Sequence, residues 1–168
     1  KGLEIHHDSD LPARTGLGSS SSFTVGLLNT LYRLNGIHVS KHDLALNAIE
    51  IERDILGETV GNQDQVAASF GGFNHLVFDR DGSLTVTPVG APQKRFQELN
   101  KHLLLFYTGI SRFASEVAKD QVARTTQNTQ QLHKMHALVD DVLKILKSKS
   151  SILPFGELLH ENWLMKRS

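Results

Sequence analysis

A glycine- and serine-rich run directly ahead of an amphipathic segment is the feature that constrains this chain most. Residues 11–22 read LPARTGLGSSSS, and apolar side chains then recur at helical spacing, at Phe23, Leu27, Leu31 and Leu34. Glycines let the backbone turn tightly and approach a ligand, and the amides that open a helix have no partner inside it. The run therefore predicts a tight loop that leads into a helix and can hold an anion such as phosphate.

This run differs from two commoner kinds of glycine-rich segment. It is not the usual Walker phosphate loop, because no Lys follows the second glycine, Gly18. A flexible Gly/Ser linker is the plain alternative, but linkers are not usually held between a strand and a strongly amphipathic helix. The serine hydroxyls could bond phosphate oxygens or reach a magnesium ion.

Helices are expected on both sides of Asn35-Gly36, which is a good stop for the helix that the serines open. Ser40 can cap a second helix, with Asp43 three residues later, and this helix ends before Gly57. Residues 57–72 predict a loop with a short helical turn. Alternation over residues 3–7 predicts a short strand ahead of the glycine-rich run.

A β-hairpin is expected over residues 73–89, because two strand-like runs flank Asp81-Gly82, whose glycine accepts the positive backbone angles of a tight turn. The apolar run His102–Tyr107 then predicts a buried strand. The last third has helical spacing up to Leu146 and again after Pro154. Residues 125–131 are wholly polar and fit either an exposed part of one long helix or a loop between two.

Bulk properties exclude several function classes. Lys plus Arg and Asp plus Glu number 18 each, so the net charge offers no general attraction for nucleic acid or an anionic membrane. With no Cys, the chain has neither a disulfide framework nor a thiolate nucleophile, and a cytoplasmic location is expected. A chain of 168 residues with 39% hydrophobic content can bury one or two modest cores.

The motif resembles that of a known superfamily. Pro12-x-x-x-Gly16-Leu17-Gly18-Ser19-Ser20-Ser21, about 45 residues ahead of Gly61-x-x-Asp64-Gln65, is similar to the second signature motif of the GHMP kinases (galactokinase, homoserine, mevalonate and phosphomevalonate kinases). Residues 61–74 and 104–112 resemble the branch that phosphorylates heptose phosphates.

The resemblance implies a two-domain α+β fold. Residues 1–97 would be part of the N-terminal, ATP-binding domain, and residues 98–168 would be the start of the C-terminal domain. The family also has one motif before the position of Lys1 and a glycine-rich motif after that of Ser168. We therefore expect this chain to be a segment truncated at both ends.

Family positions then imply residue roles. The residues expected to wrap the ATP phosphates are Arg14, Thr15, Gly16, Leu17, Gly18, Ser19, Ser20 and Ser21. Ser20 and Glu52 match the magnesium ligands, and Asp64 matches the aspartate that takes the proton from the attacking hydroxyl. From the residues alone, a helix Glu is more often a solvated surface group, and an Asp in a glycine-flanked loop often only caps a turn.

Substrate contacts are expected at Thr108, Gly109 and Arg112, which follow the predicted strand. Arg112 is suited to a two-pronged contact with a substrate phosphate, although a surface ion pair is nearly as good an explanation. His133 and His136 lie three residues apart on a predicted helix but have no third ligand, so we assign them no chemistry.

The resemblance implies an ATP- and Mg²⁺-dependent kinase that acts on a sugar or sugar phosphate, with a heptose phosphate as the leading substrate. Another sugar, such as fucose or galactose, is the nearest alternative. A catalytically silent relative that binds nucleotide or sugar and a domain used only for assembly are the rival classes. No nucleic-acid or membrane partner is expected, and a homodimer is the expected self-association.

Overall fold

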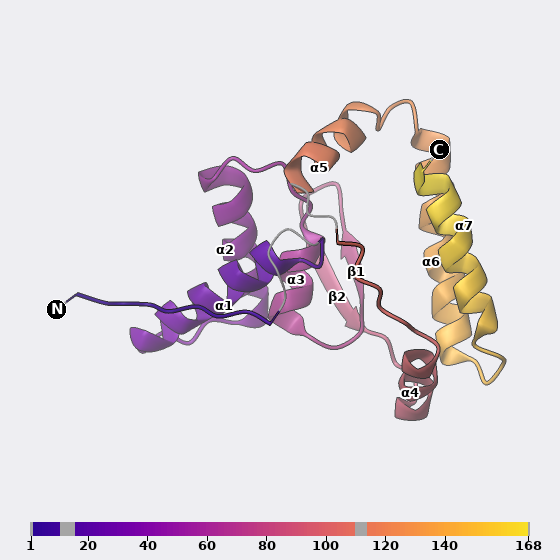
Figure 1. The fold of residues 1–168 in the computed structure, drawn as a ribbon, viewed down its shortest axis with the longest axis horizontal. Coiled ribbons are helices and arrows are strands. Elements are labelled where there is room, and N and C mark those ends of the chain that lie inside the picture. Colours follow the sequence, from indigo (N-terminus) through magenta and orange to yellow (C-terminus); the bar gives the residue numbers. More distant parts are fainter. Residues whose placement is uncertain (1, 11–15, 110–113, 168) are drawn as a thin grey trace. The chain divides into compact units, whose positions relative to one another are not determined.

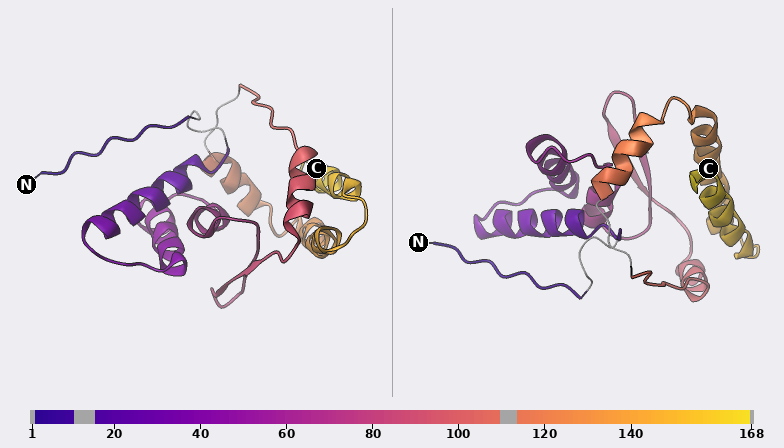
Figure 2. Two further views of the ribbon diagram at one scale, coloured as in Figure 1. Left: turned by 90° about the horizontal axis from the view of Figure 1, so that it is seen from below. Right: turned by 45° about the horizontal axis from the view of Figure 1, so that its top comes forward.

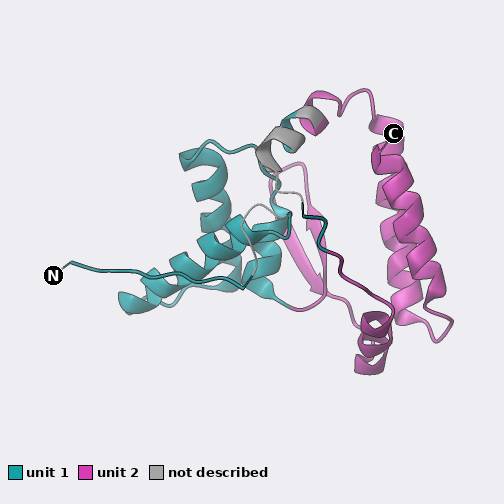
Figure 3. Cartoon of the chain, viewed as in Figure 1, with its two compact units in different colours: residues 1–71, 107–119 teal, residues 72–106, 120–168 magenta. Residues whose placement is uncertain are grey.

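Helices dominate the chain, and one two-stranded antiparallel sheet accompanies them in the part that the structure describes (Figure 1). The structure is a computed structural model that describes residues 2–10, 16–109 and 114–167. Its mixture of helices and a small sheet is α+β, as predicted. The chain divides into two units, one of Lys1–Gly71 and Tyr107–Lys119, the other of Gly72–Phe106 and Asp120–Ser168 (Figure 3).

The first unit is built from helices whose ends follow the sequence signals. They are α1 (Ser19–Leu34), α2 (Lys41–Glu50), the π-helical turn η1 (Ile51–Ile55) and α3 (Gln63–Phe70). Asn35 ends α1, and Gly36 follows it with φ of 70°. The Ser40 hydroxyl accepts a hydrogen bond of 3.0 Å from the Asp43 amide, which confirms the predicted cap of α2.

Apolar side chains of α1 and α2 form the core of the first unit. Val25, Leu44 and Ala48 are buried there, and the partly buried Leu28, Tyr32 and Val39 pack against them. Polar contacts fix the same elements. The Asn47 amide donates to the Tyr32 hydroxyl at 2.7 Å, and Lys41 Nζ donates to the carbonyl oxygen of Phe70 at the end of α3, also at 2.7 Å. The packing thus holds α1, α2 and α3 together.

Two predictions for the first unit need correction. The strand expected over residues 3–7 is wrong: residues 2–9 have no regular structure and are exposed. His7 instead meets Phe23 of α1 edge to face, with ring centroids 4.7 Å apart. The short turn expected within residues 57–72 is a helix of eight residues, α3, because Val66 and Ser69 give it a buried face.

The second unit begins with the predicted hairpin. Strand β1 (Asn74–Phe78) pairs antiparallel with β2 (Leu84–Pro88) in the register Asn74↔Pro88 to Phe78↔Leu84. The Gly82 amide donates to the Asp79 carbonyl at 3.0 Å, and Gly82 has φ of 85°. The glycine therefore makes the tight turn possible, as the sequence predicted.

The remaining helices are α4 (Gln93–Lys101), α5 (Ala114–Ala123), α6 (Thr129–Lys147) and α7 (Leu153–Arg167). The residues of α5 up to Lys119 belong to the first unit. Helices α6 and α7 lie antiparallel, side by side, in all the views (Figures 1 and 2). The core of this unit is formed by Val89, Leu99, Leu146 and Ile152. Residues 124–128 form turns between α5 and α6. Of the two alternatives for the polar stretch, a connection between two helices is therefore the one observed.

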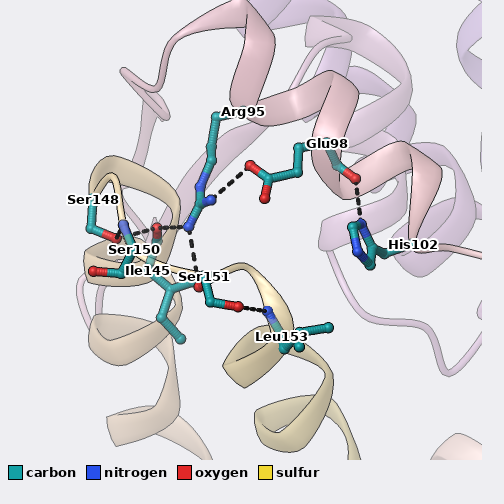
Figure 4. A network of polar contacts seen from close by, with 8 residues as sticks. All are labelled: Arg95, Glu98, His102, Ile145, Ser148, Ser150, Ser151 and Leu153. Atoms are coloured by element: carbon teal, nitrogen blue, oxygen red, sulfur yellow. Dashed lines mark hydrogen bonds and ion pairs between the residues drawn. The ribbon is translucent and has the colours of Figure 1, made fainter.

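A buried arginine ties α4 to the connection between α6 and α7 (Figure 4). Arg95 is 6% exposed, and its guanidinium donates to the Ile145 carbonyl and to Glu98 Oε2, both at 2.8 Å. The Ser151 carbonyl lies at 3.5 Å. A charged donor thus satisfies backbone acceptors where α6 ends.

The buried strand predicted for His102–Tyr107 is wrong. Residues 93–101 form α4 instead of a polar connection, and residues 103–107 have no regular structure. Leu104, Leu105 and Phe106 are 81%, 79% and 78% exposed. The domain boundary near residue 98, a position that lies in α4, stays a prediction. No helix in the described ranges is both long and apolar enough to cross a membrane.

Candidate active site

The predicted loop-to-helix transition is confirmed at Gly16–Ser22. Gly16 and Gly18 have φ of 77° and 70°, a backbone region that residues other than glycine rarely adopt, and α1 begins at Ser19. The first helical hydrogen bond runs from the Ser22 amide to the Gly18 carbonyl at 2.9 Å. The three amides before Ser22 therefore have no helical acceptor, and the first turn of α1 contains no acidic residue. Such a helix start attracts an anion.

Asp64 lies against this loop. It is the second residue of α3, where a carboxylate is favoured by the helix dipole, and it is exposed. A Cβ placed on Gly18 would lie 3.4 Å from both Cγ and Oδ2 of Asp64. The two candidate functional residues, which are far apart in sequence, are therefore in van der Waals proximity. A hydroxyl group that lay beside Asp64 would therefore also lie beside the amides of the loop.

Glu52 is buried rather than solvated. It is 2% exposed and lies in η1, where the Leu56 amide donates to the Ile51 carbonyl at 2.9 Å in the π pattern. Its neighbour Glu50 is exposed. A buried carboxylate is expensive unless hydrogen bonds compensate for lost water. Glu52 is therefore not the solvated surface group that a helix Glu usually is.

Three neutral donors from two helices surround the Glu52 carboxylate. The Ser21 hydroxyl donates to Oε2 at 2.9 Å, the Thr24 hydroxyl donates to Oε1 at 2.8 Å, and the Gln65 amide donates to Oε2. Ser21 and Thr24 belong to α1 and Gln65 to α3. Glu52 thus ties the start of α1 to α3, next to Asp64.

The oxygen atoms gathered here are of the chemical kind that magnesium prefers. Mg²⁺ prefers oxygen ligands and is commonly held by one or two carboxylates together with substrate phosphates. No described Lys, Arg or His forms an ion pair with Glu52, so its charge has no cationic partner among residues 2–10, 16–109 and 114–167. Gln65 Oε1 is buried and has no hydrogen-bond partner in the same part of the chain. No described group of three or more His, Cys, Asp or Glu residues could hold a metal.

Ser20, the other predicted metal ligand, is exposed, and its carbonyl oxygen accepts a 3.2 Å hydrogen bond from Thr24. Thr24 therefore contacts both Ser20 and Glu52. No direct contact between Ser20 and Glu52 is among those of the described residues, so their sharing of one ion stays a prediction. Ser21, predicted only to contact nucleotide, is the serine that bonds Glu52.

Only some of the residues predicted to contact substrate are among those that the structure describes. Thr108 and Gly109 belong to the first unit and are exposed, and Gly109 has φ of 73°. Arg112, together with Arg14 and Thr15 of the loop, lies outside the described residues. The substrate-binding role of this segment stays a prediction. His133 and His136 are both exposed on α6.

Sequence reasoning missed Thr24 and Gln65 as partners of Glu52. One signal was available for Thr24, since it lies one helical turn after Ser20 and three residues after Ser21 and so shares their face of α1. Gln65 follows Asp64 directly, but nothing in the sequence indicates that its amide turns toward Glu52. Its complete burial became apparent only in the structure.

Comparison with known proteins identifies relatives of this chain. Residues 1–72 match the family described as the GHMP kinases N terminal domain. The D-glycero-alpha-D-manno-heptose 7-phosphate kinase of Campylobacter jejuni is 30% identical over 167 residues, which cover 98% of this chain and 49% of that protein. Residues 1–72 are thus part of a GHMP kinase N-terminal domain. The resemblance inferred from the glycine-rich motif is thus confirmed.

Other members of the superfamily are also similar to this chain. The galactokinase of Pyrococcus furiosus is 29% identical over 150 residues, 89% of this chain and 37% of that protein. A crystal structure of a D-glycero-D-manno-heptose 1-phosphate kinase from B. thetaiotaomicron superimposes with a TM-score of 0.73 at 26% identity, covering 94% of this chain and 46% of the other. The chain thus spans about half or less of the length of these relatives.

Proposed function

We propose that the protein transfers the γ-phosphate of ATP to a hydroxyl group of a sugar or sugar phosphate. A heptose phosphate is the first candidate substrate, because heptose phosphate kinases are among the relatives in both sequence and structure. The observation that carries the proposal is the proximity of Asp64 to Gly18 at the start of α1. It combines a phosphate-binding loop with a carboxylate that can accept a proton.

The residues divide the reaction between them. The free amides and the dipole of α1 would hold the phosphate oxygens, with the side chains of Ser19, Ser20 and Ser21 as further donors. Asp64 would accept the proton of the attacking sugar hydroxyl as the oxygen of that hydroxyl bonds to the γ-phosphorus. The bond from that phosphorus to the bridging oxygen then breaks, and ADP leaves with the electron pair. Alignment and charge neutralisation supply most of the rate in such transfers.

Magnesium is part of this proposal. Glu52 and Ser20 would hold the ion, and Gln65 Oε1, which has no hydrogen-bond partner among the described residues, adds a third oxygen nearby. When bound, Mg²⁺ neutralises charge on the nucleotide phosphates. Thr108, Gly109 and Arg112 are proposed to contact the sugar phosphate. A cytoplasmic location and a homodimer also remain proposals.

A galactose-type sugar is the second candidate substrate, because galactokinases are similar to this chain over as much as 89% of its length. A substrate panel separates the candidates. The full-length protein should be incubated with MgATP and, in turn, heptose 7-phosphate, heptose 1-phosphate, galactose and fucose, and ADP release should be measured. We expect the fastest release with a heptose phosphate. ATP binding without ADP release above the sugar-free rate would instead indicate a catalytically silent relative.

Substitution of Asp64 tests the role of its carboxylate. Asp64→Asn keeps the size and polarity of the side chain but removes the proton acceptor, so the turnover number should fall by roughly two to four orders of magnitude while nucleotide affinity changes little. Asp43→Asn is the matched control, because Asp43 is also an acidic residue in the first turn of a helix, α2. Unchanged turnover in Asp64→Asn would remove Asp64 from the mechanism.

A further inference from the structure

Thr24 lies between the two residues proposed to hold magnesium. Its hydroxyl is 2.8 Å from Glu52 Oε1 and 3.2 Å from the carbonyl oxygen of Ser20. A hydroxyl has one proton, so it cannot make two full hydrogen bonds as a donor. The bond to the carboxylate is the shorter, and charged acceptors form the stronger hydrogen bonds. The Thr24 hydroxyl therefore donates its hydrogen bond mainly to Glu52.

The donors are unevenly shared between the two oxygens of Glu52. Oε2 accepts from both Ser21 and Gln65, whereas Thr24 is the one described donor to Oε1. A carboxylate oxygen offers two acceptor positions. With two donors Oε2 is saturated, and Oε1 keeps one position free of described donors. Oε1 is therefore the oxygen that can accept a cation, and Thr24 is the side chain that orients it.

The position of Thr24 gives its hydroxyl little freedom. Thr24 is partly buried in α1, one turn after Ser20, and β-branching limits its side chain to few rotamers. Glu52 is itself 2% exposed, and losing a hydrogen bond to a buried carboxylate is costly. Ser21, on the same helix face, holds the other oxygen. The two hydroxyls of α1 thus fix both rotation and tilt of the carboxylate.

The geometry points to Thr24 as a positioning residue that orients Glu52 Oε1 for the magnesium ion that Glu52 would hold. This inference rests on the proposed function, since it presumes that Glu52 holds magnesium. Thr24 acts through Glu52 and is not proposed to touch substrate. Side chains that orient a metal ligand typically change metal affinity by about 10- to 100-fold when they are removed.

Four variants of the full-length protein test this role. Thr24→Val keeps the shape and removes the hydroxyl, whereas Thr24→Ser keeps the hydroxyl. Thr30→Val is the matched control, because Thr30 makes the same bond back to the carbonyl four residues earlier, Gly26, at 2.8 Å in the same helix, without contacting Glu52. Thr24→Ala is a second hydroxyl-free variant in case Val perturbs folding.

The measurement is a titration of magnesium at a fixed concentration of a fluorescent ATP analogue, with thermal unfolding recorded in parallel. We expect Thr24→Val and Thr24→Ala to raise the half-saturating magnesium concentration about 10-fold or more. Thr24→Ser and Thr30→Val should stay near the wild type. Affinity for the analogue without magnesium should be equal in all the proteins.

The outcomes separate this inference from the proposed function. If the wild type binds the analogue with magnesium dependence and both hydroxyl-free variants keep the same half-saturating concentration, the role of Thr24 is refuted and the kinase proposal stands. Equal weakening with and without magnesium, together with a lower melting temperature, would show that Thr24 only supports the fold. No magnesium-dependent binding by the wild type would overturn both proposals.

Discussion

Gly18→Ala is the sharpest test of the arrangement at the start of α1. Gly18 has φ of 70°, and a left-handed conformation costs a residue with a Cβ about 1–2 kcal/mol. Replacing glycine also removes freedom from the unfolded chain, which returns about 0.4–1 kcal/mol. The free energy of unfolding should therefore fall by only about 1 kcal/mol. This loss is too small to unfold a typical domain.

The effect on catalysis should be much larger than the effect on stability. The new methyl group would lie 3.4 Å from Cγ and Oδ2 of Asp64, an ordinary contact that fills the space beside the carboxylate. A hydroxyl that gives its proton to Asp64 must approach its oxygen to about 2.6–3.2 Å, and it cannot share that space with the methyl. A displacement of about 1 Å can lower turnover about 100-fold.

Gly36→Ala is the matched control. Gly36 also has φ of 70°, but a Cβ there would meet nothing within 4 Å. Both variants should lose similar stability in urea denaturation, and only Gly18→Ala should lose turnover when initial rates are measured with saturating ATP and sugar phosphate. Equal turnover of the two variants would refute the idea that the space between Gly18 and Asp64 receives the acceptor hydroxyl.

Three further predictions concern stability and charge. Glu52→Gln should lower the free energy of unfolding by about 1.5–3 kcal/mol in urea denaturation, because Thr24, Ser21 and Gln65 lose a charged acceptor; no loss would show that the buried contacts do not form. Arg95→Met should cost about 2 kcal/mol by the same measurement, whereas Lys144→Met, which breaks an exposed pair with Asp141, should change little. Hydrogen bonds from Ser83 lower the pKa of Asp81. They should therefore stabilise the hairpin turn fully above the pKa of an unfolded Asp, and this stabilisation should be lost as the pH falls through the lowered pKa. An NMR titration of Asp81 with an ordinary midpoint would contradict this.

Structure that is determined locally could be predicted from the sequence. The Ser40 cap, the stop at Gly36 and the Asp79–Gly82 turn each depend on side chains and backbone angles within four residues. The helix start at Ser19 belongs to the same class. Interactions over so short a stretch are almost independent of the rest of the fold, so the sequence patterns sufficed.

Elements whose burial depends on distant partners were predicted poorly. The run Leu103–Tyr107 is apolar enough for a buried strand, yet it is exposed and has no regular structure. A strand forms only when another strand satisfies its backbone groups, and the run itself does not specify that partner. Helix α4 was missed for the opposite reason. Its sequence is mostly polar, and its burial relies on two side chains, Arg95 and Leu99.

The candidate site shows the same division. Asp64 and Glu52 were selected by their resemblance to family positions, whereas composition alone favoured a turn cap and a surface carboxylate. The burial of Glu52 depends on donors 31, 28 and 13 residues away in sequence. Such contacts arise from the packing of α1, η1 and α3. No local pattern near Glu52 contains that information.

The cluster of Glu52 with Ser21, Thr24 and Gln65 couples the stability of the first unit to its proposed chemistry. The same carboxylate ties α1 to α3 and would hold magnesium, and all four residues of the cluster lie within the 72 residues that match the GHMP kinase family. A ligand that binds only the folded form stabilises it by mass action, so magnesium and nucleotide should raise its resistance to unfolding. Loss of Glu52 removes both the tie and the ligand, so a Glu52 variant alone does not separate the two effects. The hydroxyl-free Thr24 variants separate them, because they remove one donor to the carboxylate and leave the carboxylate itself in place.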